Sequence, residues 1–134
     1  MPPSLCWRNA VIPELASGFA APVRIHIGKL DDWTPARPCQ ALTGVARNSG
    51  ADVRITVYKN AHHAFDAVGR PVERVSNVDN AADCTPRLAS PNGPILNLDE
   101  LKGCMRKGAT VGWSPEATEE ARRNVQAQLA ELLK

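Results

Sequence analysis

The chain has 134 residues, of which 43% are hydrophobic and 22% are charged, and both figures are typical of one small globular domain. Sixteen lysines and arginines against fourteen acidic residues leave a net charge of +2, and the basic residues are scattered, so no nucleic-acid partner is expected. No uncharged stretch approaches the roughly 18 apolar residues that a membrane-spanning helix needs, so no membrane partner is expected either.

The first half of the chain predicts a strand, a helix and a second strand. Residues 22–28 alternate apolar and polar side chains, which is the period of a strand. Thr34 followed by Pro35 is a typical helix start, and apolar residues then recur at helical spacing up to Asn48. Residues 52–58 alternate again, so we expect a βαβ unit with two parallel neighbouring strands.

The second half has weaker patterns. Residues 67–112 show no sustained period and are rich in Pro, Gly, Asn and Asp, which predicts a long loop. Residues 113–133 predict a final helix, opened by Ser114 and Pro115. One face of this helix is apolar and is expected to pack inward; it contains Ala117, Ala121, Val125, Leu129 and Leu132 or Leu133. Residues 1–134 are therefore expected to form a single α/β domain.

The four cysteines, Cys6, Cys39, Cys84 and Cys104, include no C-x-x-C pair, which disfavours a zinc ribbon or a redox pair. Disulfides are the favoured interpretation, and four reduced thiols in a cytosolic protein are the alternative. We expect Cys6 to pair with Cys39, and Cys84 to pair with Cys104 across the long loop. Disulfides favour a periplasmic or secreted location, but the first residues lack the basic start and apolar run of a signal peptide.

Candidate catalytic residues follow the two predicted strands. Asp31 lies three residues past the first strand, and His63 lies five residues past the second, next to His62. Parallel strands about 4.8 Å apart end at one sheet edge, so a carboxylate and an imidazole can meet there and make the histidine a general base. The alternative for Asp31 is an ordinary loop aspartate near a helix start. Because His62, His63 and a cysteine lack any recognised ligand spacing, neither a metal nor a cofactor is expected.

Residues 28–36, Gly-Lys-Leu-Asp-Asp-Trp-Thr-Pro-Ala, and 58–66, Tyr-Lys-Asn-Ala-His-His-Ala-Phe-Asp, carry a resemblance to a known family. They resemble the acid motif G-x-x-D-x-x-x-P-A and the histidine motif Y-x-x-A-x-H-x-F of the dienelactone hydrolase family. The resemblance implies an α/β-hydrolase fold and an enzyme that cleaves ester or lactone bonds with a Cys/Ser-His-Asp triad. It places the acid on Asp31 and the histidine on His63, and it gives Asp32 and His62 no catalytic duty.

Two aromatic residues flank these motifs. Trp33 and Phe65 are expected either to line an apolar substrate-binding pocket or to act as plain packing residues. Cys39 and the closing residues 104–117 resemble a branch of the family that looks exported, which again favours a periplasmic or secreted location.

One part of the family pattern is missing. The family presents its nucleophile in G-x-C-x-G or G-x-S-x-G, and no such motif occurs in this sequence. Ser4, Cys6 and Ser17, which precede Asp31, lack the flanking glycines that the strained turn requires. The resemblance thus implies a partial α/β-hydrolase fold, with a C-terminal βαβ unit, a disulfide-stapled loop and a C-terminal helix, and without the nucleophile-bearing N-terminal half.

The missing nucleophile leads to two expectations. The chain alone is expected to have negligible esterase activity, because the covalent step needs the absent Cys or Ser. The alternative function is that of an inactive remnant that acts as a binding module and self-associates through an exposed sheet edge. A self-sufficient disulfide-bonded α/β domain with an unrelated function is a third interpretation.

Overall fold

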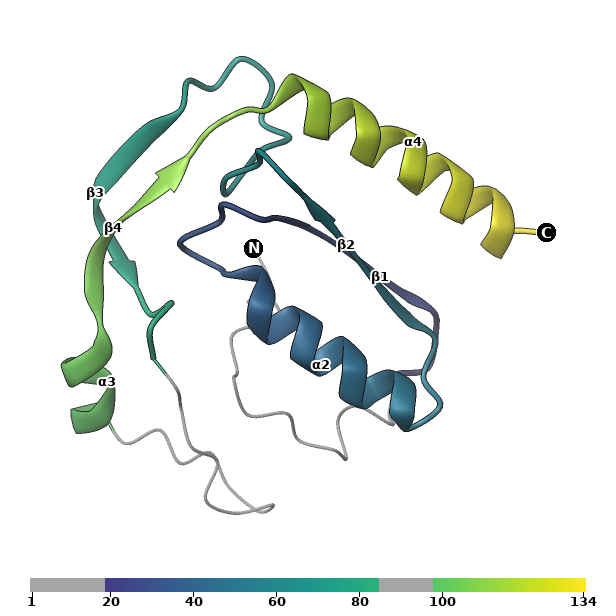
Figure 1. Cartoon of the computed structure of the whole chain (residues 1–134), viewed down its shortest axis with the longest axis horizontal. Helices are drawn as coiled ribbons and strands as arrows, with labels where there is room; N and C mark the ends of the chain where they lie inside the picture. Colours follow the sequence, from purple (N-terminus) through teal and green to yellow (C-terminus); the bar gives the residue numbers. More distant parts are fainter. Residues whose placement is uncertain (1–18, 85–97) are drawn as a thin grey trace.

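In the computed structural model, residues 19–84 and 98–134 are described. They form a mixed α/β structure that ends in a long helix (Figure 1). In chain order, the elements of these residues are β1 (Val23–Gly28), α2 (Ala36–Asn48), β2 (Val53–Tyr58), β3 (Glu73–Asn80), α3 (Leu98–Cys104), β4 (Arg106–Val111) and α4 (Pro115–Leu132).

The strands β1 and β2 form a parallel sheet, which runs from Val23 opposite Val53 to Gly28 opposite Tyr58. The helix α2 lies on one face of this sheet and α4 lies on the other (Figure 1). On the α2 side, Ala46 and Val53 are buried at the centre of an apolar cluster. The βαβ unit predicted for residues 22–58 is therefore confirmed.

The opposite face of the sheet joins α4 through both apolar and polar contacts. Tyr58 is almost fully buried at the centre of the apolar cluster on this side. Its hydroxyl lies 2.7 Å from Nδ1 of His26 and accepts a hydrogen bond from Asn124 in α4. Nε2 of His26 lies 3.0 Å from Oε1 of Gln128, also in α4. Hydrogen bonds of Asn124 and Gln128 thus attach α4 to this face of the sheet.

The orientation of α4 corrects the prediction for its apolar face. Ala117 is buried and Ala121 packs against the core, but the next two residues facing the sheet are Asn124 and Gln128. Residues one position further along a helix lie about 100° around its axis, so Val125 and Leu129 turn away from the sheet. The exposed fractions are 38% for Val125, 49% for Leu129, 38% for Leu132 and 79% for Leu133.

The segment 67–112, predicted as a long loop, contains an antiparallel pair of strands and a short helix, so that prediction is wrong. The strands β3 and β4 pair from Glu73 opposite Val111 to Asn80 opposite Arg106, with an irregularity between Val75 and Asp79. Most residues of β3 are exposed, so its sequence carries no alternation of apolar and polar residues. Backbone pairing and polar contacts hold this hairpin together, and neither leaves a hydrophobic period in the sequence.

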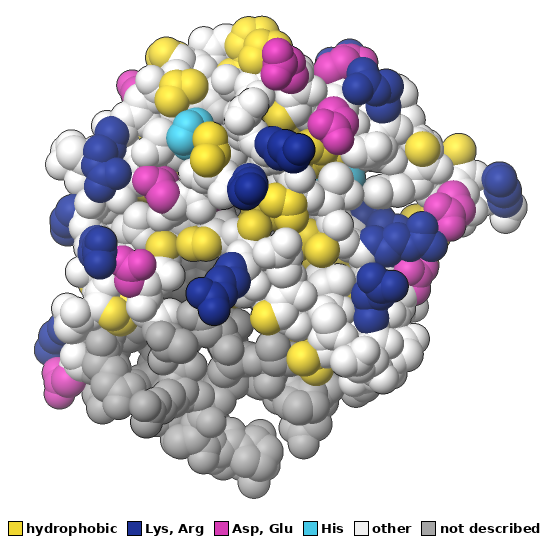
Figure 2. All heavy atoms as spheres, in the orientation of Figure 1, with side chains coloured by type: hydrophobic (Ala, Val, Ile, Leu, Met, Phe, Trp, Pro, Cys, Tyr) yellow, Lys and Arg dark blue, Asp and Glu magenta, His cyan; other side chains and the backbone are white. Residues whose placement is uncertain are grey.

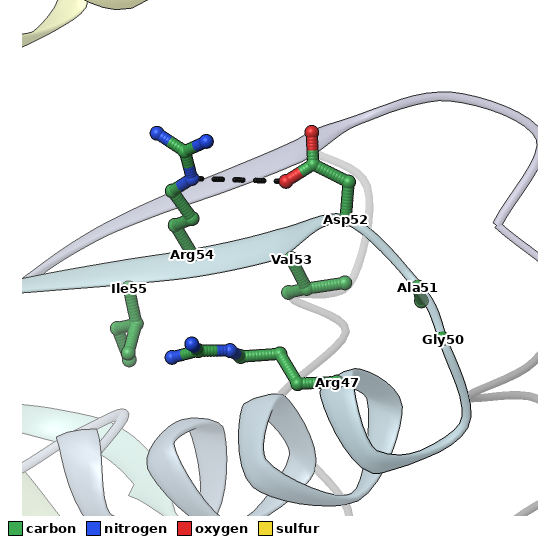
Figure 3. A pocket seen from close by; sticks show the side chains of 7 residues that line it. All are labelled: Arg47, Gly50, Ala51, Asp52, Val53, Arg54 and Ile55. Atoms are coloured by element: carbon green, nitrogen blue, oxygen red, sulfur yellow. Dashed lines mark ion pairs between the residues drawn. The ribbon is translucent and has the colours of Figure 1, made fainter.

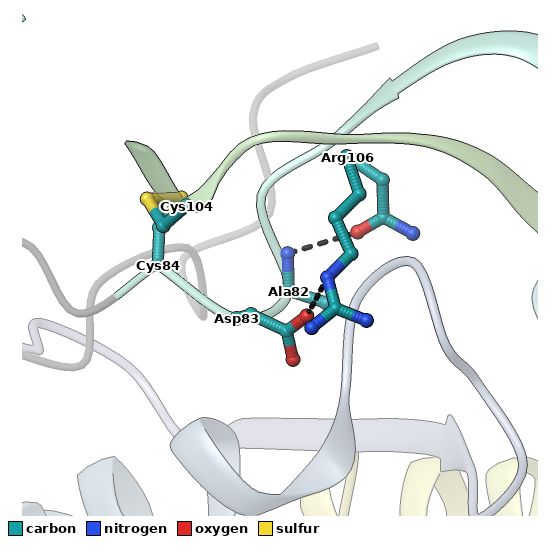
Figure 4. The surroundings of a disulfide bond; sticks show 6 residues. Ala82, Asp83, Cys84, Cys104 and Arg106 are labelled. Atoms are coloured by element: carbon teal, nitrogen blue, oxygen red, sulfur yellow. Dashed lines mark hydrogen bonds and ion pairs between the residues drawn. A yellow bond between two sulfur atoms is a disulfide. The ribbon is translucent and has the colours of Figure 1, made fainter. Parts of the chain in front are cut away.

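The predicted disulfide between Cys84 and Cys104 is confirmed, and it lies at the end of the β3–β4 pair where residues 81–105 connect the two strands (Figure 4). The two residues are 20 positions apart, with a Cα–Cα distance of 5.0 Å. Next to them, Arg106 forms an ion pair with Asp83 at 2.6 Å. Cys39 is fully buried in α2, whereas its predicted partner Cys6 lies outside the described residues.

Charges of both signs are interspersed over the face of the molecule in Figure 2, among apolar side chains. Within residues 19–84 and 98–134, no helix combines the length and apolar character that a membrane crossing requires.

Candidate active site

Asp31 and His63, which follow β1 and β2, are within hydrogen-bond distance of each other. Oδ2 of Asp31 lies 3.0 Å from Nδ1 of His63. The Asp31 side chain is 5% exposed and the His63 side chain 27%, so the carboxylate is buried behind an imidazole that reaches the surface. The parallel sheet thus brings together the two side chains that the sequence pairs at one strand edge.

The carboxylate of Asp31 is held by the residues that follow it. Oδ1 accepts hydrogen bonds from the backbone N–H groups of Trp33, at 3.0 Å, and Thr34, at 2.7 Å. Oδ2 accepts the hydroxyl of Thr34 at 2.7 Å. These three donors fix the orientation of the carboxylate, and in this orientation Oδ2 also faces His63.

Thr34 is a site residue that the sequence did not identify. It was expected to cap a helix, but α2 begins at Ala36, Pro35 occupies the N-cap position, and no side chain caps the helix. The Thr34 hydroxyl donates to Asp31 instead and lies 3.1 Å from Nδ1 of His63. Because its single hydrogen points to Asp31, its oxygen can share the Nδ1 hydrogen with the carboxylate.

Gly28 allows the acid loop and the histidine loop to approach each other. The N–H of Lys29 donates to Tyr58 O, and the N–H of Leu30 donates to Ala61 O at 2.9 Å. A side chain at position 28 would overlap the carbonyl oxygen of Ala61. The first position of the acid motif therefore requires glycine because the two loops are in backbone contact there.

The end of β4 supports the histidine loop from the other side. Val111 forms a parallel bridge with His63, and the N–H of Gly112 donates to the His63 carbonyl at 3.1 Å. Ala64, which follows His63, has φ of 57°, a left-handed conformation that a non-glycine residue rarely adopts. The backbone around His63 is thus fixed by β4 and by a sharp turn.

The two flanking aromatic residues differ in position. The Trp33 ring lies against the His63 imidazole, with ring centroids 4.8 Å apart, and its Nε1 donates to Asp79 O. Phe65 is buried in the core beside Tyr58, with ring centroids 5.2 Å apart. Phe65 thus occupies a packing position, the second role that the sequence leaves open, and its contact with substrate stays a prediction.

Asp32 and His62, the sequence neighbours of Asp31 and His63, have different hydrogen-bond partners. The carboxylate of Asp32 accepts hydrogen bonds from Thr110 in β4. Nδ1 of His62 lies 3.2 Å from the carbonyl oxygen of Leu30. His63, and not His62, is therefore the imidazole within hydrogen-bond distance of Asp31.

The contact between Asp31 and His63 shifts both pKa values in the direction that favours the charged forms. The hydrogen bond that His63 donates to Asp31 raises the pKa of His63 above its usual 6.5, and burial offsets this only in part. Burial raises the pKa of Asp31, but the hydrogen bonds from His63 and Thr34 outweigh it, so this pKa lies below its usual 3.8. A neutral His63 donates Nδ1–H to the ionised Asp31, which leaves the Nε2 lone pair free to accept a proton.

The two pKa shifts predict a pH-dependent stability. A raised histidine pKa stabilises the fold below pH 6.5, and this contribution is lost as pH rises through the folded-state pKa. A lowered aspartate pKa stabilises it above pH 3.8, and this contribution is lost as pH falls through the folded-state value. We expect H63Q to lose about 1.5 kcal/mol of unfolding free energy near pH 5.5, and less at pH 9.

Urea unfolding of the wild type and H63Q across this pH range measures the difference. Both proteins keep His26 and His62, so the comparison isolates the contribution of position 63. A difference that stays constant from pH 5.5 to pH 9 would contradict the ion pair.

A hollow at the other end of β2 is separate from this site. Its volume is about 460 Å³, and Figure 3 shows Arg47 of α2 beside Val53 and Ile55. Asp52 and Arg54 line its rim and form an ion pair at 3.7 Å. Since Asp31 and His63 follow the opposite ends of the strands, this hollow is not part of the acid–histidine site. Among the described residues, no group of three or more His, Cys, Asp or Glu side chains could hold a metal ion.

A parallel βαβ unit with an acid–histidine pair beyond its strand ends places this chain among α/β proteins whose site lies at the carboxyl edge of the sheet. The sequence model of the dienelactone hydrolase family matches residues 12–88, which are 77 of the 134 residues. The chain therefore belongs to the dienelactone hydrolase family. The matched range contains both Asp31 and His63. No curated protein and no solved structure matches the chain.

Proposed function

We propose that this chain supplies the acid and the base of an ester- or lactone-cleaving hydrolase whose nucleophile lies on a polypeptide segment outside this sequence. The observation that carries the proposal is the 3.0 Å contact between Asp31 Oδ2 and His63 Nδ1, formed by two loops of a dienelactone hydrolase family member. The fold in this proposal is the C-terminal part of an α/β hydrolase, and the reaction uses no metal or cofactor.

In this mechanism, Nε2 of His63 takes the proton of a Cys thiol or Ser hydroxyl as that group attacks the carbonyl carbon. Asp31 keeps the proton on Nδ1 and stabilises the imidazolium that forms. The imidazolium then gives its proton to the departing alkoxide as the ester C–O bond breaks, and the acyl group remains on the nucleophile as an acyl-enzyme. Water attacks the acyl group, its proton passes to His63, and the carboxylic acid is released while the nucleophile regains its hydrogen.

The surroundings of the pair suit this role. The imidazole of His63 is partly exposed and can receive a substrate, while the carboxylate behind it is shielded from water. Trp33 lies against the imidazole and offers an apolar surface beside it, so we propose Trp33 as a substrate contact.

The test is hydrolysis of p-nitrophenyl acetate by the 134-residue chain and by the same chain joined to the G-x-C-x-G or G-x-S-x-G segment of another family member. We expect no turnover above background from the chain alone and turnover from the joined protein. Turnover by the chain alone that disappears in H63Q would contradict the need for an external nucleophile.

The exposed side of α4 favours a second candidate function, in which the chain is an interaction module that binds a second copy of itself. Val125, Leu129 and Leu132 form a partly exposed apolar ridge at helical spacing. Among the described residues, β1 and β2 each pair with only one strand, so each keeps a free edge beside this helix. The apolar ridge of α4 and the free edges of β1 and β2 together provide a surface that can pair with a second copy of the chain.

Sedimentation velocity over a range of concentrations tests this candidate. We expect a dimer in the wild type and a shift of at least tenfold in the dimer dissociation constant for L129K, because a charge at the centre of the ridge opposes burial. E116Q, at the exposed start of the same helix, is the control and should leave the dissociation constant unchanged. A wild type that remains monomeric at all concentrations would contradict the module.

A further inference from the structure

The residue after the acid, Asp32, attaches the acid loop to β4. Its Oδ1 accepts the N–H of Thr110 at 2.7 Å, and its Oδ2 accepts the Thr110 hydroxyl at 3.0 Å. Arg74 of β3 lies 3.6 Å from the same carboxylate. The carboxylate is therefore bound to both strands of the hairpin, although 43% of the side chain is exposed.

Two further contacts fix the same part of the loop. Asn80, which is buried, donates from Nδ2 both to the carbonyl oxygen of Asp32 and to that of Gly108, each at 2.9 Å. Trp33 donates from Nε1 to the carbonyl oxygen of Asp79 at 3.1 Å. Residues 32 and 33 are thus attached to β3 and β4, while residues 31 and 34 on either side of them contact His63.

The histidine loop is attached to the same strand. Thr110 binds Asp32, Val111 bridges to His63, and Gly112 donates to the His63 carbonyl. Three consecutive residues at the end of β4 therefore hold the acid loop and the histidine loop. The acid loop and the histidine loop also contact each other directly, where the N–H of Leu30 donates to Ala61 O, so β4 provides a second link between them.

We infer that Asp32 is a positioning residue, which anchors the acid loop through Thr110 on the strand that holds the histidine loop and so sets the hydrogen bond between Asp31 and His63. The inference rests on the proposed function for the purpose of that hydrogen bond, but its test needs no enzymatic activity. The carboxylate at position 32 acts through Asp31 and takes no part in proton transfer.

The test is an NMR pH titration of the His63 imidazole in the full chain, with its signal assigned by comparison with H63Q. We expect the wild-type pKa to lie above 6.5 and D32A to lose most of that elevation, because Asp31 is no longer held against His63. T110V removes only the hydroxyl donor and changes no charge, so we expect a smaller downward shift that Coulomb effects cannot explain.

D52A is the matched control, since it also removes a carboxylate from an ion pair, the one with Arg24 at 2.9 Å, at the opposite end of β2. We expect D52A to leave the His63 pKa unchanged. If D32A folds and its His63 pKa equals that of the wild type, the inference is wrong. If D32A does not fold, an unchanged His63 pKa in T110V is the result that overturns the inference. A wild-type pKa at or below 6.5 would contradict the Asp31–His63 pair itself, which is a different failure.

Discussion

H63Q, introduced into the joined protein that carries the nucleophile segment, is expected to lower kcat by about six orders of magnitude. The side-chain amide of glutamine can still donate a hydrogen bond to Asp31, but it cannot take up a proton from the nucleophile. D31N is expected to lower kcat by about four orders of magnitude, because an amide beside Nδ1 no longer favours the tautomer with its lone pair on Nε2. The measurement is kcat for p-nitrophenyl acetate under saturating conditions.

The control for this prediction is H62Q. His62 is the adjacent imidazole, and its Nδ1 lies 3.2 Å from the Leu30 carbonyl oxygen, whereas His63 contacts the Asp31 carboxylate. We expect H62Q to change kcat by no more than a few-fold. A loss in H62Q as large as that in H63Q would mean that the wrong imidazole has been assigned as the base. H63Q and D31N should also not add when combined, because both remove the function of one unit.

C84A/C104A is expected to lower the free energy of unfolding by about 3 kcal/mol, the loop-closure contribution for a bridge that spans 20 residues. The bridge closes the hairpin β3–β4, whose strand β3 buries few side chains. Without it, the unfolded chain gains freedom that backbone pairing in the hairpin does not offset. Urea unfolding of the wild type and the double variant at one pH measures this difference.

S76A is the control for the disulfide, because Ser76 lies in β3 with its side chain exposed. We expect its effect on the unfolding free energy to stay within about 0.5 kcal/mol. A double variant with unchanged stability would mean that backbone pairing and the contacts of Asp32 and Asn80 hold the hairpin without the bridge. Mutation is preferable to a reductant, which would act on every disulfide of the chain.

The sequence predicted the part of the fold in which local pattern and packing agree. In β1 and β2, apolar side chains alternate because one face of each strand packs against α2, and this burial produces the period. The acid–histidine pair was predictable for the same reason, since two parallel strands that end at one edge bring Asp31 and His63 together. Ser114 and Pro115 also mark the start of α4 correctly.

The features that were missed depend on contacts between distant residues. Thr34 precedes a proline and carries a typical N-cap side chain, but the buried Asp31 carboxylate competes for its hydroxyl. Asp32 contacts Thr110, 78 positions later, and no local pattern signals such a pair. The irregular strand β3 exposes most of its side chains, so it carries no period from which a strand could be predicted.

The position of the apolar side chains of α4 follows a related rule. Periodicity identifies an apolar face but not the surface on which it packs. In this chain Asn124 and Gln128 bind Tyr58 and His26, which turns Val125 and Leu129 toward solvent. A signal for this orientation lies in His26 and Tyr58, since polar groups on a sheet face that a helix covers require polar partners from that helix.

The pH dependence of kcat/KM in the joined protein, for the wild type and D31N, tests the role of the pair most directly. Activity requires neutral His63, so the rate should fall at acidic pH with a midpoint at the pKa of this imidazole in the free enzyme. We expect a midpoint above 6.5 in the wild type, because Asp31 raises that pKa, and a lower midpoint together with a reduced maximal rate in D31N. An acidic midpoint that is the same in both proteins would contradict the assignment of Asp31 and His63 as one acid–base unit.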